Sequence, residues 1–180
     1  MKEMALEIKL NDSQIRTRLK EDLYLKEHLY NPVSVFIFNT SGRLMLQQRS
    51  FTKSHSAGLW SNTCCSHPHM DETAYTAAQR GLLDEMGFKC TFSHHFKIKI
   101  LAEEKDQEIK DPLSDIFIGY SNQLPSINPM EATAYRLMTI DEIREDITEF
   151  PEKYTSWFRF TFPVIEDIFM NEYSQSKLPS

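Results

Sequence analysis

Residues 58–68 have the sequence Gly-Leu-Trp-Ser-Asn-Thr-Cys-Cys-Ser-His-Pro, which places two cysteines and a histidine close together. The thiolate is the form of cysteine that reacts with substrates or binds metals, and a neighbouring cation favours it. A thiol beside an imidazole therefore indicates a nucleophile or a metal ligand within this segment. A lone buried cysteine that only packs in the core is the alternative.

Composition limits the classes of protein to which the chain can belong. Its 180 residues suit one domain, and a hydrophobic fraction of 41% is ordinary for a globular protein. The net charge of −6 argues against broad nucleic-acid binding. Three cysteines, two of them adjacent, form no disulfide framework and favour a cytoplasmic location. The sequence shows no signal peptide, and no window approaches the roughly 20 apolar residues of a membrane span.

Strands and helices are predicted on both sides of the quoted segment. Residues 33–38 form a strand, and alternating residues 43–49 form its hairpin partner across a turn at 39–42. The quoted segment follows in a loop. A helix is predicted from Glu72, capped by Asp71 and ended by Gly87.

The second half of the chain alternates between the same two kinds of element. We expect strands within 88–102, at 115–120 and at 135–138, a polar loop at 103–110, and helices at 140–147 and 154–169. Thr139 caps the first of these helices. This order predicts an α+β fold with a mixed sheet sandwiched by helices. We expect one domain over residues 1–180, with an N-terminal extension at 1–30 and a flexible tail at 174–180.

Three further groups of residues accompany the quoted segment: Ser34–Asn39, Leu46–Ser50 and Lys53. With them, the chain resembles the type I isopentenyl diphosphate isomerases, whose fold belongs to the Nudix superfamily. The resemblance extends from about Gln14 to Phe169. It implies a Nudix-type domain and an enzyme that protonates the alkene of isopentenyl diphosphate and removes another proton, giving dimethylallyl diphosphate.

The resemblance also assigns roles to individual residues. Cys65 matches the catalytic thiol, and Arg49 and Lys53 match the cations that bind the diphosphate. Trp157 matches an aromatic residue that faces the carbocation, and Glu85 matches the ligand of a Mg²⁺ ion that bridges to the diphosphate.

Two further residues complete the expected site. His67 matches a histidine that binds a transition metal. Because a carbocation needs π faces and the exclusion of water, Trp60 is a second candidate for substrate binding.

A Nudix hydrolase signature is present only in part. Glu72 and Arg80 have the expected spacing, whereas Ser66 replaces the leading glycine and Gly81 replaces a glutamate. Hydrolysis of a diphosphate needs several carboxylates that converge on metal ions. Depletion of the acids supports the fold more than a hydrolase activity.

Five positions depart from the isomerase pattern. Residues that would bind the transition metal or handle protons are replaced by Tyr24, Tyr30, Ile100, Lys110 and Pro112. Tyrosines, a lysine and a proline cannot replace histidines and carboxylates as metal ligands. We therefore predict that the transition-metal site is absent and that the standard isomerase mechanism is altered.

Four functions remain open from the sequence. The first is isomerisation or protonation of a prenyl diphosphate, with Mg²⁺ as the cofactor. The second is cyclisation or rearrangement of a longer prenyl diphosphate. The third is prenyl-diphosphate binding without catalysis, and the least favoured is pyrophosphate hydrolysis.

Overall fold

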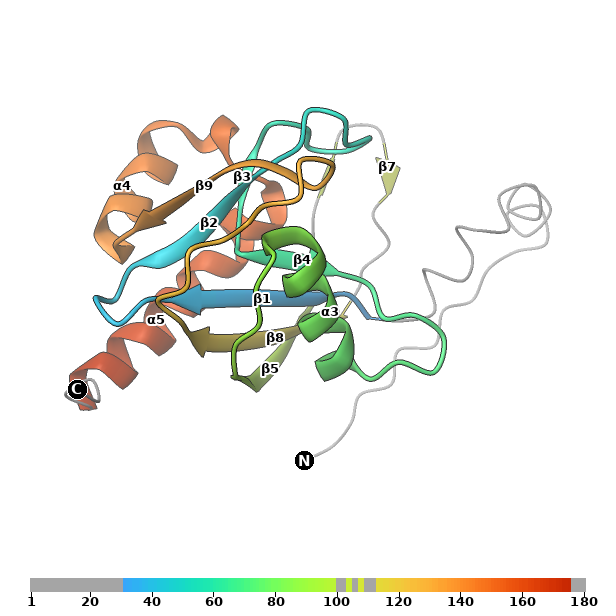
Figure 1. Cartoon of the computed structure of the whole chain (residues 1–180). Helices are drawn as coiled ribbons and strands as arrows, with labels where there is room; N and C mark the ends of the chain where they lie inside the picture. Colours follow the sequence, from blue (N-terminus) through green and yellow to red (C-terminus); the bar gives the residue numbers. More distant parts are fainter. Residues whose placement is uncertain (1–30, 100–102, 105–106, 109–112, 176–180) are drawn as a thin grey trace.

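A computed structural model describes residues 31–99, 103–104, 107–108 and 113–175 of the chain (Figure 1). The elements, in chain order, are β1 (Val33–Phe38), β2 (Leu44–Arg49), β3 (Trp60–Ser61), β4 (Cys64–Ser66), α3 (Ala74–Met86), β5 (Phe92–Lys99), β6 (Glu103–Glu104), β7 (Gln107–Glu108), β8 (Leu113–Tyr120), β9 (Ala132–Met138), α4 (Ile140–Glu149), the 3₁₀ turn η1 (Pro151–Lys153) and α5 (Ser156–Gln175).

Seven of the described strands form one mixed sheet. The order β3-β2-β1-β8-β5 runs through hydrogen-bonded neighbours, β4 pairs with β1, and β9 pairs with β2. Strand β1 is parallel to β8, whereas the pairs β1–β2, β2–β9 and β5–β8 are antiparallel. This arrangement confirms the predicted α+β class and the hairpin of residues 33–49.

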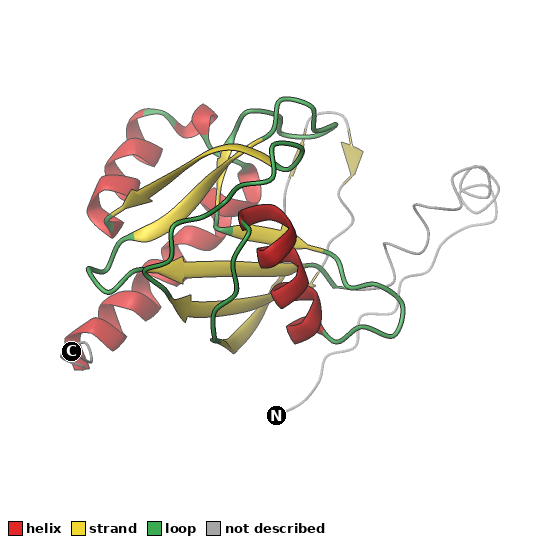
Figure 2. Cartoon of the chain, viewed as in Figure 1, coloured by secondary structure: helices red, strands yellow, loops and turns green. Residues whose placement is uncertain are grey.

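Helices cover both faces of the sheet (Figures 1 and 2), with α3 on one face and α5 on the other. Alternation along β1 sends Val33, Val35 and Ile37 into the core beneath α3. Phe36 and Phe38 enter the second core, which Phe158 and Phe162 of α5 help to fill. The continuous apolar run of β1 thus reflects a strand buried on both faces.

Strands β1 and β2 diverge beyond their turn, and residues 60–66 fill the gap between them. Trp60 and Ser61 pair with β2, whereas Cys64 to Ser66 pair with β1. At the crossing point, the buried Thr63 hydroxyl accepts a hydrogen bond from the Ile37 N–H at 2.9 Å and donates one to the Met45 carbonyl at 2.6 Å. The expectation of a loop is wrong for residues 60–61 and 64–66, because they pair with β2 and β1. Between these two strands, the Thr63 hydroxyl satisfies backbone groups of β1 and β2 that no longer pair with each other.

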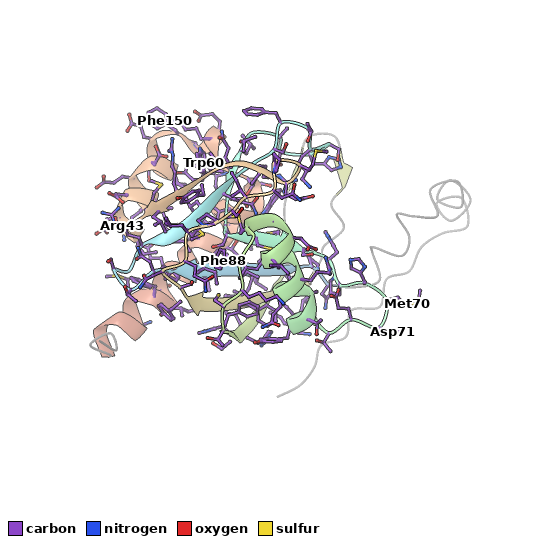
Figure 3. The ribbon with its side chains drawn as sticks, viewed as in Figure 1. Arg43, Trp60, Met70, Asp71, Phe88 and Phe150 are labelled. Carbon is purple, nitrogen blue, oxygen red and sulfur yellow. The ribbon has the colours of Figure 1, made fainter. Side chains whose placement is uncertain are left out.

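The start of α3 also differs from the prediction. Asp71 does not cap the helix: it adopts a left-handed φ of 66° in an exposed turn (labelled in Figure 3). Thr73 is the cap, and its hydroxyl accepts a hydrogen bond from the Thr76 N–H at 3.1 Å. Gly87 ends α3 at φ 74°, as predicted, and the added Cβ of any other residue would lie 2.3 Å from the Ser126 carbonyl oxygen.

Other boundaries differ less. Thr139 caps α4, as predicted, and together with Glu142 it forms a capping box. Strands β6 and β7 pair within the segment predicted as a polar loop. Helix α5 begins at Ser156, and the Thr155 hydroxyl before it accepts a hydrogen bond from the Phe158 N–H. The helix continues to Gln175 rather than ending at Phe169. Residues 1–30 and 176–180 lie outside the described part of the chain.

Candidate active site

The two adjacent cysteines lie on opposite faces of β4. Cys64 is fully buried beneath α3, and its thiol donates to Glu85 Oε1 at 3.4 Å. Cys65 pairs with Ser34 across the strands and is only partly buried. Because successive side chains of a strand point to opposite faces of the sheet, the two adjacent thiols lie in different environments.

Polar groups surround the Cys65 thiol. Its Sγ donates to Asn62 Oδ1 at 3.1 Å and lies 3.5 Å from the Ser34 hydroxyl, which is 3.1 Å from the Ser114 hydroxyl. Asn62 is oriented because its amide nitrogen donates to the carbonyls of Val35 and Cys64. Burial raises the pKa of the Cys65 thiol, and the Ser34 hydroxyl opposes that rise. The arrangement favours a protonated thiol with a fixed direction.

Glu85 is a buried carboxyl group near the C-terminal end of α3. Gln47 Nε2 donates to its Oε2 at 2.6 Å, and the same amide nitrogen donates to the Thr63 carbonyl at 3.0 Å. Burial is the largest cause that raises the pKa of Glu85 to about 7. The carboxyl group therefore changes charge near neutral pH.

The two altered positions of the Nudix signature lie against each other. A Cβ added at Gly81 would lie 2.6 Å from the Ser66 Cβ and 3.0 Å from Cys64 Sγ. There is therefore no room at position 81 for a glutamate. The serine that replaces a glycine and the glycine that replaces an acid are two parts of one close contact between α3 and β4.

The retained parts of the signature hold the segment before α3. Arg80 donates from Nε and Nη2 to the two carboxylate oxygens of Glu72, at 3.0 Å each, and from Nη2 to the His67 carbonyl at 2.8 Å. The Arg80 hydrogen bonds lower the pKa of Glu72. Both residues are occupied in shaping the loop, which suits a structural role.

The two expected diphosphate cations already have protein partners. Arg49 donates from Nε and Nη2 to the His55 carbonyl, at 3.3 and 3.1 Å, and its guanidinium carbon lies 5.2 Å from the centroid of the Trp157 ring. Lys53 forms an ion pair with Glu131. Arg49 lowers the pKa of Cys65 and Lys53 lowers that of Glu85, so each cation lies within electrostatic range of one of these groups.

Helix α5 places Trp157 on the same side of the sheet as Cys65. The Thr155 N–H donates to the Trp60 carbonyl at 2.9 Å, and the hydroxyls of Thr155 and Ser61 are 3.1 Å apart. These bonds fix the start of α5 to β3. The Trp157 Nε1 is buried and has no hydrogen-bond partner among the described residues, which leaves an unpaired donor near the start of α5.

Trp60 has a different environment from Trp157. Trp60, which is labelled in Figure 3, is only 7% exposed. The Arg136 guanidinium carbon lies 4.3 Å from the centroid of the Trp60 ring. Arg136 borders a shallow acidic hollow beside α4, together with Glu142 and Asp146. The structure therefore assigns Trp60 a packing role, and its contact with substrate stays a prediction.

Two kinds of metal ion are considered for this site, Mg²⁺ and a transition metal. Magnesium is commonly bound through one or two carboxylates together with substrate phosphates, and the oxygen donors of Glu85 fit that ion. His67 is exposed, and the described residues contain no cluster of three or more histidine, cysteine, aspartate or glutamate side chains that could bind a metal. The five replaced positions, Tyr24, Tyr30, Ile100, Lys110 and Pro112, lie outside the described residues, so the absence of a transition-metal site stays a prediction.

Several residues of the site were not anticipated. Gln47, Asn62 and Thr63 lie within segments that the family pattern includes, but their hydrogen bonds depend on tertiary contacts. Glu131, the partner of Lys53, lies 78 positions away in the sequence and carries no local signal.

Comparison with known proteins gives the class first. The model of the NUDIX domain matches residues 29–158. A crystal structure of a MutT protein from Methanosarcina mazei superimposes with a TM-score of 0.61 at 20% identity, covering 80% of this chain and 94% of the other. The fold is therefore that of a NUDIX domain. Among the described residues, no helix has both the length and the apolar character needed to cross a membrane.

Curated relatives narrow the class to a family. An isopentenyl-diphosphate Delta-isomerase from Pectobacterium atrosepticum is 38% identical over 87% of this chain and 88% of its own length. Another from Serratia proteamaculans is 35% identical over 96% of this chain and 94% of its own length. The chain belongs to the isopentenyl-diphosphate Delta-isomerase family within the NUDIX superfamily.

Proposed function

We propose that this protein is an isomerase that interconverts isopentenyl and dimethylallyl diphosphate. The observation that carries the proposal is the position of Cys65, a partly buried and hydrogen-bonded thiol on the sheet face that α5 covers with Trp157. The relatives described above are named for the same reaction, which favours isomerisation over cyclisation, non-catalytic binding or hydrolysis.

The diphosphate would bind through cations at the end of β2. Arg49 Nη1 has no hydrogen-bond partner among the described residues, and it can donate to a phosphate oxygen while Nε and Nη2 remain on His55. Lys53 supplies a second positive charge. Glu85 would hold a Mg²⁺ ion, which neutralises phosphate charge when it is bound.

The alkene would then lie beside Cys65 and Trp157. Adding a proton to the terminal methylene leaves a tertiary carbocation. Removing a proton from the carbon between this cationic centre and the carbon that carries the diphosphate oxygen gives the product. The thiol of Cys65 transfers one of these protons, and the face of Trp157 stabilises the cation. The Arg49 guanidinium carbon lies 5.2 Å from the centroid of the Trp157 ring, which supports the proposal that this ring attracts positive charge.

Two wider aspects of function follow from composition. We propose a cytoplasmic location, because the described cysteines, Cys64, Cys65 and Cys90, are all free thiols. We also propose a small-molecule substrate rather than a nucleic acid, in keeping with the net charge of −6.

Incubation in deuterated water tests the proposal. The protein and Mg²⁺ are mixed separately with isopentenyl, dimethylallyl, geranyl and farnesyl diphosphates, and the products are analysed by mass spectrometry and NMR. We expect deuterium to enter the two five-carbon diphosphates. The Cys65→Ala variant should incorporate little deuterium, and Cys90→Ala should match the unaltered protein.

Other outcomes identify the competing functions. A cyclic or rearranged product from the longer diphosphates indicates the second function. Release of phosphate indicates hydrolysis. Saturable binding of isopentenyl diphosphate without deuterium uptake indicates a binding protein, and each of these results contradicts the isomerase proposal.

A further inference from the structure

Glu131 holds Lys53 at the position where a diphosphate would need that cation. The Lys53 ammonium donates to Glu131 Oε2, and the two side chains are only 27% and 32% exposed. Their backbones are also tied together: the Ser50 N–H donates to the Glu131 carbonyl at 2.9 Å, and the Lys53 N–H donates to the Ser50 carbonyl at 3.2 Å. The backbone hydrogen bonds therefore hold Lys53 and Glu131 close to each other, so their ion pair does not depend on the side-chain conformations alone.

The turn that carries Glu131 is also docked on the end of α3. The Asn128 N–H donates to the Glu85 carbonyl at 2.9 Å, and the Glu131 N–H donates to the Asn128 carbonyl at 2.9 Å. The charge of Glu131 raises the pKa of Glu85, whereas Lys53 lowers it. Two carboxyl groups and one ammonium thus lie within electrostatic range of one another at the diphosphate end of the site.

The charges decide which form of the ligand is favoured. Glu131 cancels the charge of Lys53, so of these two cations Arg49 is the one left to attract a free diphosphate, and both carboxylates repel that anion. A diphosphate that has bound Mg²⁺ carries less negative charge, and the ion can approach the same carboxylates favourably.

We propose that Glu131 is a selectivity residue that makes diphosphate binding at Arg49 and Lys53 depend on a divalent cation. Without the cation, Glu131 competes with the ligand for Lys53 and repels it. With the cation, the repulsion is removed and Lys53 can turn to the phosphate. The inference deepens the proposed function, on which it rests for the position of the diphosphate.

Calorimetric titration with inorganic pyrophosphate tests the inference without any turnover. Binding is measured in Mg²⁺ and in EDTA for the unaltered protein and for Glu131→Gln, which keeps the shape of the side chain and removes its charge. We expect Glu131→Gln to bind pyrophosphate about tenfold more tightly in EDTA. Its affinity in Mg²⁺ should change by less than about threefold, so the dependence on the cation falls.

Matched variants separate this effect from a general change in charge. Glu166→Gln also removes one negative charge and one ion pair, to Arg144 in α4, and should leave both affinities unchanged. Lys53→Met should weaken binding in both conditions. In the double variant of Lys53 and Glu131, the gain in EDTA should largely disappear. Thermal unfolding of each variant checks that it is folded.

Three outcomes would overturn the inference. The first is equal behaviour of Glu131→Gln and Glu166→Gln. The second is a loss of affinity confined to Mg²⁺, which would make Glu131 a metal ligand instead. The third is that the unaltered protein binds pyrophosphate neither in Mg²⁺ nor in EDTA. If Glu131→Gln gains affinity in EDTA but isopentenyl diphosphate takes up no deuterium, the isomerase proposal fails and the inference stands.

Discussion

The sheet places two neighbouring thiols in opposite surroundings. On the α3 side, Cys64 is closed off by Ala77 and Leu82 and faces the buried carboxyl group of Glu85. On the α5 side, Cys65 is partly buried and faces an amide oxygen and a hydroxyl. The difference separates a cysteine enclosed in the core from a partly buried cysteine on the face where we propose that the substrate binds.

Charge follows the same division. On the α3 side, burial raises the pKa of the Glu85 carboxyl group to about 7. Burial also raises the pKa of the Cys64 thiol well above its usual value. On the α5 side, the groups beside Cys65 are neutral hydroxyls and an amide, and the Arg49 cation lies near the ring of Trp157. In the proposed function, a diphosphate with Mg²⁺ would bind at the end near Glu85, and the hydrocarbon would lie against the face near Trp157. Residues of β4 connect the two.

Removing the two thiols one at a time should give the largest difference in kcat between matched variants. Cys65→Ala should lower kcat by about 10²–10⁴-fold, because it removes a proton-transfer group. Cys64→Ala should leave kcat within about threefold and lower the free energy of unfolding by about 1 kcal/mol. Steady-state kinetics and urea denaturation measure the two effects. Equal losses of kcat would show that the division between the faces is wrong.

The pH dependence of stability should reveal the buried acid on the α3 side. The pKa of Glu85 is about 7 in the folded protein, against 4.5 for an unperturbed glutamate. The folded state therefore binds more protons than the unfolded state between these pH values. The contribution of Glu85 to the free energy of unfolding is complete below about pH 4.5. It is lost as the pH rises through about 7, which lowers the free energy of unfolding by about 3 kcal/mol.

Urea denaturation from pH 4.5 to 8 checks this sign with matched variants. Glu85→Gln should lose most of the dependence on pH. Asp84→Asn, which alters the exposed neighbouring acid, should retain it. A stability that rises over this range in the unaltered protein, and not in Glu85→Gln, would contradict the direction of the pKa shift.

Position 81 tests the close contact between α3 and β4. Gly81→Ala should lower the free energy of unfolding by about 1–3 kcal/mol, because the added methyl group meets Ser66 and Cys64. A second change, Ser66→Gly, should recover part of the loss. Urea denaturation of both single variants and the double variant measures the coupling. A Gly81→Ala variant that gains stability, as helix propensity alone would give, would contradict the contact.

The smallest effect is expected at the retained half of the Nudix signature. Glu72→Gln should cost about 1 kcal/mol, because Glu72 is a partly exposed partner of Arg80. Activity should change little, since the pair shapes the loop before α3. Urea denaturation at low and high salt, with parallel kinetics, checks both statements. A loss of kcat comparable to that of Cys65→Ala would instead assign Glu72 to the chemistry.

Much of this organisation follows from local sequence. The apolar run at residues 33–38, the hairpin turn, Gly87 and the Thr139 cap are short-range signals, and each of them fixed its element correctly. Asp71 failed as a cap because two neighbouring residues have suitable side chains, and only the backbone φ selects Thr73. The family was identifiable because residues 58–68 carry an uncommon order of polar and sulfur-containing side chains.

The sequence by itself therefore determined the class of fold and the family, and its assignment of catalytic residues stays a prediction. Only the tertiary structure decided that residues 60–66 join two diverging strands, that Gly81 and Ser66 share one contact, and that Glu131 faces Lys53. The physical reason is the sequence separation of the residues that interact. Backbone conformation depends on near neighbours, whereas packing and charge pairing depend on residues that are distant in the chain until it folds.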